Sequence, residues 1–134
     1  MSMDKYASRR YDTLKEDAID VTVLETLPFE YAGSNTEIVY QTDEFTSVCP
    51  WTGLPDFARM AITYVPDAKL IELKSLKYYL TSFRSVGILQ EHAVNRVLND
   101  LVGLLQPVSM VVEADFNDRG GIKTKASARY QRLL

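Results

Sequence analysis

The segment from Val94 to Leu105 constrains the fold more than any other, because its apolar residues recur every three or four positions. Residues with that spacing lie on one side of an α-helix, so the segment predicts an amphipathic helix. Pro107 follows, and because proline cannot continue a helix, the helix is expected to end before it. The rest of the chain must supply an apolar surface against which this helix packs.

A second helix is predicted just before this one. Four apolar residues there share one helical face: Leu76, Tyr79, Leu80 and Phe83. Ser75 precedes them and is a good N-cap, because its hydroxyl can accept a backbone N–H of the first turn. We expect this helix to begin at Ser75 and to end near Gly87.

Apolar and polar residues alternate on both sides of the predicted helices, as they do in half-buried strands. These segments are 38–48, 57–65 and 69–73 before the helices, and 110–116 and 122–130 after them. Residues 66–68 are expected to close a hairpin, and residues 119–121 are expected to form a second turn. This order predicts an α+β fold in which two helices cover one face of an antiparallel sheet, in the order ββααββ.

Length and composition favour one globular domain. The chain has 134 residues, of which 46% are hydrophobic and 25% are charged. Residues 1–20 show no useful periodicity, so we expect a flexible N-terminal arm followed by a single domain over residues 21–134. No apolar run approaches the roughly 20 residues of a membrane-spanning helix, and residues 1–10 lack the apolar stretch of a secretory signal. We therefore expect a cytoplasmic protein that does not enter a membrane.

Charge and residue counts argue against several functions. Fifteen lysines and arginines against eighteen acidic residues give a net charge of −3, which disfavours broad nucleic-acid binding. One cysteine and one histidine cannot assemble a zinc site, so we expect no metal. The six glycines form neither a dinucleotide-binding G-x-G-x-x-G nor a phosphate-binding P-loop.

Cys49, the only cysteine, begins a turn-rich loop whose one acidic residue is Asp56. Loops held by a rigid scaffold often carry reactive groups. A thiolate and a proton donor are the minimum for covalent catalysis on an electrophilic carbon. Cys49 and Asp56 are therefore the candidate catalytic residues, and a buried packing cysteine is the alternative that the sequence leaves open.

Two positions carry residues suited to bind anions. Lys74 and Lys77 lie where a helix is predicted to begin, and together with the free N–H groups of that helix they predict a phosphate site. Arg119 lies beside the flexible backbone of Gly120, which also suits a phosphate. Solvated lysines and an ordinary hairpin turn are the alternatives.

Glu91 is expected in the first turn of the longer helix, where the helix dipole favours an acid. A carboxylate can also accept two parallel hydrogen bonds from the N–H and amino groups of a guanine-like ring. Glu91 is therefore either a helix-stabilising acid or a purine anchor. We interpret His92 mainly as a surface or interface residue.

Residues 72–79, ELKSLKYY, resemble the signature motif of the NADPH-dependent nitrile reductases of the 7-cyano-7-deazaguanine reductase (QueF) family. The loop CPWTGLPDF, residues 49–57, resembles the catalytic loop of the same family. Further matches follow in the expected order: Phe83-Arg84, Glu91, Asn99-Asp100-Leu101 and Arg119-Gly120-Gly121-Ile122. The resemblance covers about residues 42–129, and the chain length resembles the short single-module form. The departures are Gln90, where histidine is common, and Trp51 and Leu54, where lysine and glutamine are common.

This resemblance implies a tunnelling fold, in which subunits join their sheets into rings that stack face to face. It implies a homo-oligomer with active sites between subunits. It also implies a small-molecule 7-deazaguanine nitrile as the substrate, no direct contact with nucleic acid, and a role in making queuosine precursors.

Residue roles carry over from the family position by position. Cys49 would attack the nitrile carbon to form a covalent thioimide, and Asp56 would supply the proton. NADPH would then deliver hydride twice, converting the nitrile through an imine to a primary amine. The residues implied to hold the substrate are Ile71, Glu72, Leu73, Gln90 and Glu91, and those implied to hold the cofactor are Lys74, Lys77, Arg119 and Gly120.

Two other functions stay open. A non-reducing relative, in which ammonia intercepts the thioimide to form an amidine, would keep Cys49 and Asp56 but would not need Lys74 and Lys77. A catalytically silent binding subunit would be favoured if Cys49 lay buried far from any pocket. Zinc-dependent enzymes of the same fold are excluded, because one cysteine and one histidine cannot supply their metal site.

Overall fold

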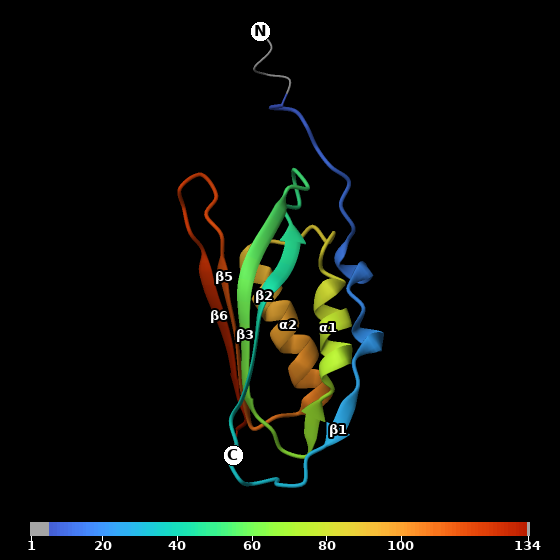
Figure 1. Ribbon diagram of the computed structural model, residues 1–134, viewed down its shortest axis with the longest axis vertical. Coiled ribbons are helices and arrows are strands. Elements are labelled where there is room, and N and C mark those ends of the chain that lie inside the picture. The colour runs from blue at the N-terminus through green and yellow to red at the C-terminus, as the bar shows by residue number, and fades with distance from the viewer. Residues whose placement is uncertain (1–5, 134) are drawn as a thin grey trace.

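A four-stranded antiparallel sheet with two helices against one face forms the body of the protein (Figure 1). The computed structural model describes residues 6–133. In chain order the elements are η2 (Glu16–Ala18), η3 (Val21–Val23), β1 (Thr26–Pro28), β2 (Ile38–Val48), β3 (Pro55–Val65), β4 (Lys69–Ile71), α1 (Leu73–Thr81), α2 (Gln90–Leu105), β5 (Ser109–Phe116) and β6 (Lys125–Gln131). The sheet order is β2-β3-β5-β6, and every neighbouring pair is antiparallel. The predicted α+β fold, with its helices between the strands, is confirmed.

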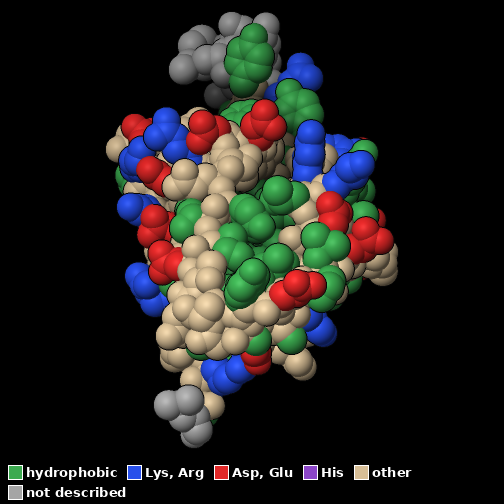
Figure 2. Space-filling model, turned by 60° about the horizontal axis from the view of Figure 1, so that its bottom comes forward, with side chains coloured by type: hydrophobic (Ala, Val, Ile, Leu, Met, Phe, Trp, Pro, Cys, Tyr) green, Lys and Arg blue, Asp and Glu red, His purple; other side chains and the backbone are tan. Residues whose placement is uncertain are grey.

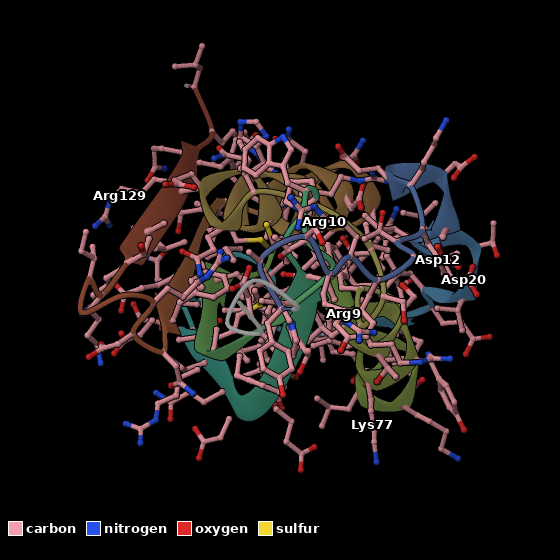
Figure 3. The ribbon with its side chains drawn as sticks, turned by 90° about the horizontal axis from the view of Figure 1, so that it is seen from above. Arg9, Arg10, Asp12, Asp20, Lys77 and Arg129 are labelled. Carbon is pink, nitrogen blue, oxygen red and sulfur yellow. The ribbon has the colours of Figure 1, made fainter. Side chains whose placement is uncertain are left out.

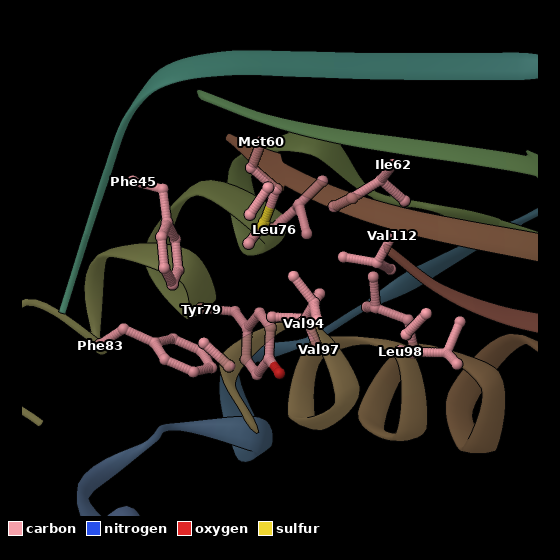
Figure 4. Close-up of a cluster of buried hydrophobic side chains, with 14 of the residues drawn as sticks. Phe45, Met60, Ile62, Leu76, Tyr79, Phe83, Val94, Val97, Leu98 and Val112 are labelled. Atoms are coloured by element: carbon pink, nitrogen blue, oxygen red, sulfur yellow. The ribbon is translucent and has the colours of Figure 1, made fainter. Parts of the chain in front are cut away.

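The hydrophobic core lies between the sheet and the two helices (Figure 4). Alternate residues of β3 point into it, and Met60, Ile62 and Tyr64 are each at most 2% exposed. The rings of Phe45 and Phe83 pack with centroids 5.3 Å apart and planes tilted by 56°, a geometry that aromatic pairs favour. Because side chains alternate between the two faces of a strand, the alternation in the sequence marks the face that meets the helices.

β4 pairs with β1 and does not form the expected hairpin with β3. The two short strands make a separate sheet in which Thr26 pairs with Ile71. β3 already has β2 on one edge and β5 on the other, so neither edge is left for β4. The predicted hairpin at residues 66–68 is therefore wrong, because the chain turns out of the main sheet at that point.

α1 begins before Ser75, and Glu72 is its N-cap. The Glu72 carboxylate accepts the backbone N–H groups of Lys74 and Ser75, both at 2.8 Å. Ser75 lies in the first turn, where its hydroxyl donates to the Glu72 carbonyl at 2.7 Å. These reciprocal bonds satisfy N–H groups that have no partner within the helix and fix its start at Leu73, so the predicted N-cap at Ser75 is wrong.

α1 also ends earlier than expected, at Thr81 instead of near Gly87. The backbone around Gly87 is held by the end of β2. The Val48 N–H donates to the Val86 carbonyl at 3.0 Å, and the Ile88 N–H donates to the Val48 carbonyl at 3.1 Å. Backbone groups that bond to a strand in this way cannot also continue the helix.

α2 spans the segment that the periodicity predicts. Gln106 caps it in the left-handed conformation with φ of 47°, and Pro107 follows. Its buried residues fall on the face toward the sheet: Ala93, Val94, Val97, Leu98, Leu101 and Leu105. The predicted end of this helix before residue 107 is confirmed.

The segment that follows residue 10 runs alongside α1 and contacts the domain (Figure 1). Ile19 is 4% exposed and belongs to the core, and the Asp20 N–H donates to Ser82 Oγ at 2.9 Å. The sequence did not predict these contacts, because one apolar residue among charged ones carries no periodicity. The flexibility of residues 1–20 and the domain start at residue 21 stay predictions, and residues 1–5 lie outside the described residues.

Candidate active site

The loop of residues 49–54 joins β2 to β3 at one end of the sheet, at the top of Figure 1. Two backbone bonds close it: the Cys49 N–H donates to the Leu54 carbonyl at 2.9 Å, and the Gly53 N–H donates to the Cys49 carbonyl at 2.8 Å. Gly53 has a φ of +73°, a conformation that costs other residues free energy. The loop therefore holds Cys49 in a tight turn at the end of β2.

Hydrogen bonds around Cys49 favour its thiolate. The residue is 4% exposed, and this burial by itself raises the pKa of the thiol. Hydrogen bonds from the side chain and backbone of Thr52, from the backbone of Trp51 and from Arg119 outweigh burial and lower the pKa from 9.0 to about 7. Much of the thiol is therefore in the nucleophilic form at neutral pH. Thr52 is not singled out by any sequence pattern above, and a hydroxyl three residues after a cysteine in a tight turn is the signal that would find it.

Asp56 is the second residue of β3, on the buried face of the strand, and it is 4% exposed. Arg119 Nη1 lies 3.3 Å from Asp56 Oδ1, and the side chain of Gln90 also hydrogen-bonds the carboxylate. Burial raises the pKa of the Asp56 carboxyl, and the favourable contacts with Arg119 and Gln90 offset only part of that rise. A carboxyl that keeps its proton at higher pH than usual is suited to act as an acid.

Arg119 links the two candidate catalytic residues. It precedes a turn in which Gly120 has a φ of +58° and Gly121 a φ of +82°. The residues on either side of these glycines exchange backbone hydrogen bonds of 2.9 and 3.0 Å, which closes the hairpin. The Arg119 side chain, 48% exposed, reaches both Asp56 and Cys49. The turn was predicted from the sequence, whereas the contacts of Arg119 with the two candidate catalytic residues were not.

The first turn of α2 borders this group. Gln90 begins the helix and reaches Asp56, as described above. Glu91 follows in the first turn, as predicted, and both Glu91 and His92 are exposed. An exposed carboxylate at this position is open to the N–H groups of a ligand.

The other predicted site residues lie just before α1 or within its first five residues. They are Ile71, Glu72, Leu73, Lys74 and Lys77, of which Ile71 is buried and Leu73, Lys74 and Lys77 are exposed. α1 begins beside β4 and runs toward the Cys49 loop (Figure 1). Its 9 residues make it about 13 Å long. One chain therefore does not bring the residues at the start of α1 together with Cys49.

The start of α1 differs from the phosphate site that the sequence predicts. The N–H groups of Lys74 and Ser75 donate to Glu72, so they are not free to bind an anion. These two bonds lower the pKa of Glu72, which is therefore negatively charged at neutral pH. The exposed ammonium groups of Lys74 and Lys77 remain available for a phosphate.

An apolar pocket of about 280 Å³ lies between β2 and α1. Its lining includes Tyr40, Ile62 and Leu76 together with Lys77, and it does not include Cys49. Figure 2 shows hydrophobic side chains gathered in the middle of one face of the molecule, with charged side chains around them. Among the described residues, β2 pairs along one edge only, so this pocket adjoins an open edge of the sheet.

Within residues 6–133, no group of three or more histidine, cysteine or acidic side chains is placed to hold a metal ion. None of the helices in that same part of the chain is long and apolar enough to cross a membrane.

Comparison with known proteins decides the family. A family described as QueF-like protein matches residues 55–133, which is more than half of the chain. The chain belongs to the QueF family. This confirms the resemblance carried by residues 49–57 and 72–79.

Curated relatives in the QueF family share most of the chain. A protein of Caldicellulosiruptor bescii is 60% identical over 129 residues, which are 96% of this chain and 98% of the relative. A protein of Thermoanaerobacter pseudethanolicus is 58% identical over 129 residues, or 96% of this chain and 97% of the relative. One of Thermotoga maritima is 48% identical over 123 residues, or 91% of this chain and 88% of the relative. All three are named NADPH-dependent 7-cyano-7-deazaguanine reductase.

A solved structure gives the fold relationship. The crystal structure of the archaeosine synthase QueF-Like in the apo form matches with a TM-score of 0.68 at 20% identity. The match covers 75% of this chain and 99% of that chain. At this identity it speaks for the fold alone, and it confirms the tunnelling fold expected for a member of the QueF family.

The described residues fit the phosphates of NADPH, on which the named QueF relatives depend. Lys74 and Lys77 present exposed ammonium groups, and the guanidinium of Arg119 is half-exposed. Cations of this kind bind phosphate oxygens through charge-assisted hydrogen bonds. The fit rests on these side chains, since the N–H groups of Lys74 and Ser75 are already bonded to Glu72.

Proposed function

We propose that this protein reduces the nitrile of 7-cyano-7-deazaguanine to the primary amine 7-aminomethyl-7-deazaguanine, with NADPH as the reductant, in queuosine biosynthesis. The observation that carries the proposal is the contact of Arg119 with both Cys49, a thiol of lowered pKa, and Asp56, a buried carboxyl of raised pKa. Relatives named for this reaction at 60% and 58% identity support it. The amidine-forming alternative is not favoured, since it needs no reductant whereas these relatives are named NADPH-dependent.

Cys49 is the proposed nucleophile. Its Sγ attacks the nitrile carbon, so an S–C bond forms while one π bond between carbon and nitrogen breaks. The nitrogen gains the proton that the thiol loses, and the product is a covalent thioimide with no leaving group. The lowered pKa of Cys49 favours this step because it raises the thiolate fraction at neutral pH.

Asp56 is the proposed proton donor while the thioimide is reduced. NADPH, when bound, supplies a hydride twice, and the substrate carbon passes through the imine to the amine as the thiolate of Cys49 is released. Asp56 gives a proton to the substrate nitrogen, and its raised pKa keeps that proton available. Arg119, 3.3 Å away, then balances the charge of the carboxylate that is left.

Carboxylates are the proposed anchors of the deazaguanine ring. Glu91 accepts hydrogen bonds from the ring N–H and amino groups, and Gln90 beside it contributes a neutral partner. Glu72 is the second proposed anchor, together with the backbone around Ile71 and Leu73. Each Glu72 oxygen accepts one backbone N–H within α1 and keeps a second lone pair for a ligand.

We further propose that each active site is shared by two chains of a homo-oligomer. Lys74 lies in the first turn of α1, at the far end of the helix from Cys49, so a ligand that contacts both residues needs one of them from a neighbouring chain. The open edge of β2 and the apolar pocket beside it support docking of a second copy, as expected for sheets joined into stacked rings. A cytoplasmic location stays part of this proposal.

The test is an assay of NADPH absorbance with 7-cyano-7-deazaguanine as the substrate. We expect two NADPH to be consumed for each nitrile, with the primary amine as the product, and no consumption by the Cys49→Ala variant. Asp56→Asn is expected to turn over slowly. A wild-type protein that binds the nitrile without oxidising NADPH would overturn the proposal in favour of the amidine-forming alternative or the silent binding subunit.

A further inference from the structure

We propose that residues 11–14 form a strap that positions the nucleophile, with Tyr11 as a positioning residue that acts through the peptide of Thr52. The inference rests on the proposed role of Cys49 as the nucleophile. It goes beyond that role, because it assigns a task to a segment that contributes no catalytic side chain.

The strap is bonded to the catalytic loop and to the chain segment beside it. The Tyr11 N–H donates to the Thr52 carbonyl at 2.9 Å. Three residues later, the Leu14 N–H donates to the Ser85 carbonyl at 2.8 Å, and the Gly87 N–H donates to the Leu14 carbonyl at 2.9 Å. The strap therefore has two separate anchors, one on the loop itself and one on residues 85–87.

Residues 85–87 also support the base of the loop. Val48 and Gly87 form a parallel bridge, and Leu14 and Val86 form another. The strap, residues 86–88 and the end of β2 thus lie side by side, with Cys49 directly after the bridged residue of β2. Figure 3 shows the segment that carries Arg10 and Asp12 running across this end of the molecule.

Two glycines provide room for the strap against the loop. A Cβ placed on Gly53 would lie 2.5 Å from the Tyr11 carbonyl oxygen, closer than real Cβ atoms approach. A Cβ on Gly87 would lie 3.2 Å from Thr13 Oγ1 and 3.1 Å from Pro50 Cα. The close approach of strap and loop therefore depends on residues without side chains at both positions.

Thr52 connects the strap to the thiol through hydrogen bonds. Its Oγ1 accepts the Leu54 N–H at 3.2 Å, and its side chain and backbone both hydrogen-bond Cys49. The bond from Tyr11 holds the carbonyl of the same residue. The charged groups beside the thiol are Arg119, which bonds it and pairs with Asp56, and Glu91 in the exposed first turn of α2. Losing the Tyr11 bond is expected to loosen Thr52 while leaving Arg119 and Asp56 in place.

The test compares Tyr11→Pro with Tyr11→Ala in the full chain. Proline lacks the N–H that bonds Thr52, whereas alanine keeps it and removes only a ring that is 62% exposed. The readout is the rate of Cys49 alkylation by iodoacetamide against pH, measured without nitrile or NADPH. In wild type and Tyr11→Ala we expect the inflection near the thiol pKa of about 7, and in Tyr11→Pro we expect it to move toward the ordinary value of 9.0.

Activity gives a second readout that separates positioning from binding. We expect kcat of Tyr11→Pro at pH 7 to fall on the order of five-fold, following the lost thiolate fraction, with KM for the nitrile unchanged. Alkylation needs neither the nitrile nor NADPH. Tyr11→Pro would therefore show the shifted inflection even if the protein had no reductase activity, provided the strap acts as proposed. An unchanged inflection in Tyr11→Pro would overturn the inference.

Leu14→Pro tests the second anchor should Tyr11→Pro fail to fold. It removes the N–H that bonds Ser85 at a residue that is 52% exposed. We expect the same upward move of the alkylation inflection in the folded variant. If neither variant folds, the segment is a folding element and the positioning role is overturned.

Discussion

Asp56 and Ser47 face one another across the β2–β3 pair, on the buried side of the sheet. Among the described residues, Ser47 Oγ and Asp56 Oδ1 are buried atoms without a hydrogen-bond partner. Arg119 meets Oδ1 at 3.3 Å as an ion pair only. A buried carboxylate with incomplete hydrogen bonding is costly, so the neutral acid is favoured and the pKa of Asp56 rises. The features that destabilise this carboxylate are thus the ones that fit it to donate a proton.

Asp56→Asn should therefore raise stability while it lowers turnover. A raised pKa means that the contribution of Asp56 to stability is complete below its unfolded pKa and is lost as the pH rises through its folded pKa. Asparagine does not ionise, so the variant does not lose stability as the pH rises. We expect its unfolding free energy to exceed that of wild type by on the order of 1 kcal/mol at pH 8 and by little at pH 4. Thermal unfolding at a series of pH values measures this. A gain of the same size at every pH would contradict the assigned protonation of Asp56.

At the scale of elements, the β5–β6 hairpin brings a cation to a site built mainly by β2, β3 and α2. Its turn places Gly120 and Gly121 at positive φ, and Arg119 before them reaches Asp56, 63 positions earlier in the chain. Neither glycine has an atom within 4 Å of a Cβ built on it, so backbone conformation alone selects glycine there. The conformation of the hairpin turn therefore affects the pKa of the Cys49 thiol through the side chain of Arg119.

Gly121→Ala tests this coupling. At a φ of +82°, we expect alanine to cost about 1 kcal/mol of unfolding free energy and to displace Arg119, which raises the inflection of Cys49 alkylation above pH 7. Gly103→Ala is the control: it is exposed within α2, has open space around it, and is expected to stabilise by about 0.5–1 kcal/mol. A stable Gly121→Ala variant with an unchanged alkylation profile would show that the hairpin does not set the position of Arg119.

Local patterns in the sequence predicted the helices and strands well, but they did not predict the contacts between these elements. Alternation predicted β3, and the stop at Pro107 predicted the end of α2, because both signals are local. The pairing of β4 depends on β3 having both edges occupied, which is a property of the whole sheet. The Glu72 cap was missed for a different reason, since Ser75 carries the stronger local preference for an N-cap. The roles assigned to the site residues stay predictions, although Cys49, Asp56, Gln90 and Arg119 do lie together.

In the molecule as a whole, the predicted site residues are divided between the two ends of α1. Cys49 and Glu91 lie near one end of α1, Lys74 lies in the first turn at the other end, and Lys77 lies at the middle of the helix. About 10 Å of rigid helix separates Lys74 from the end of α1 at Thr81, so small adjustments of side chains cannot bring Lys74 to Cys49. Assembly with a second copy can bring them together, because a symmetric interface can place the start of α1 in one chain beside Cys49 of its neighbour.

Mixing two defective variants tests the shared site. Cys49→Ala lacks the proposed nucleophile, and the double variant Lys74→Ala with Lys77→Ala is expected to lose activity at low NADPH. After subunits are exchanged, sites with the nucleophile from one variant and the lysines from the other should restore about a quarter of wild-type activity. Native mass spectrometry confirms that mixed oligomers form. Mixed oligomers that stay inactive would contradict a site shared between chains.

The intact mass of the protein after mixing with 7-cyano-7-deazaguanine, before any NADPH is added, shows whether Cys49 is the nucleophile. Addition of the Cys49 thiol across the nitrile has no leaving group, so we expect a gain equal to the whole mass of one nitrile per chain. The gain should be absent in Cys49→Ala and should disappear when NADPH is supplied. A wild-type protein without the gain, or a Cys49→Ala variant that keeps it, would contradict Cys49 as the nucleophile.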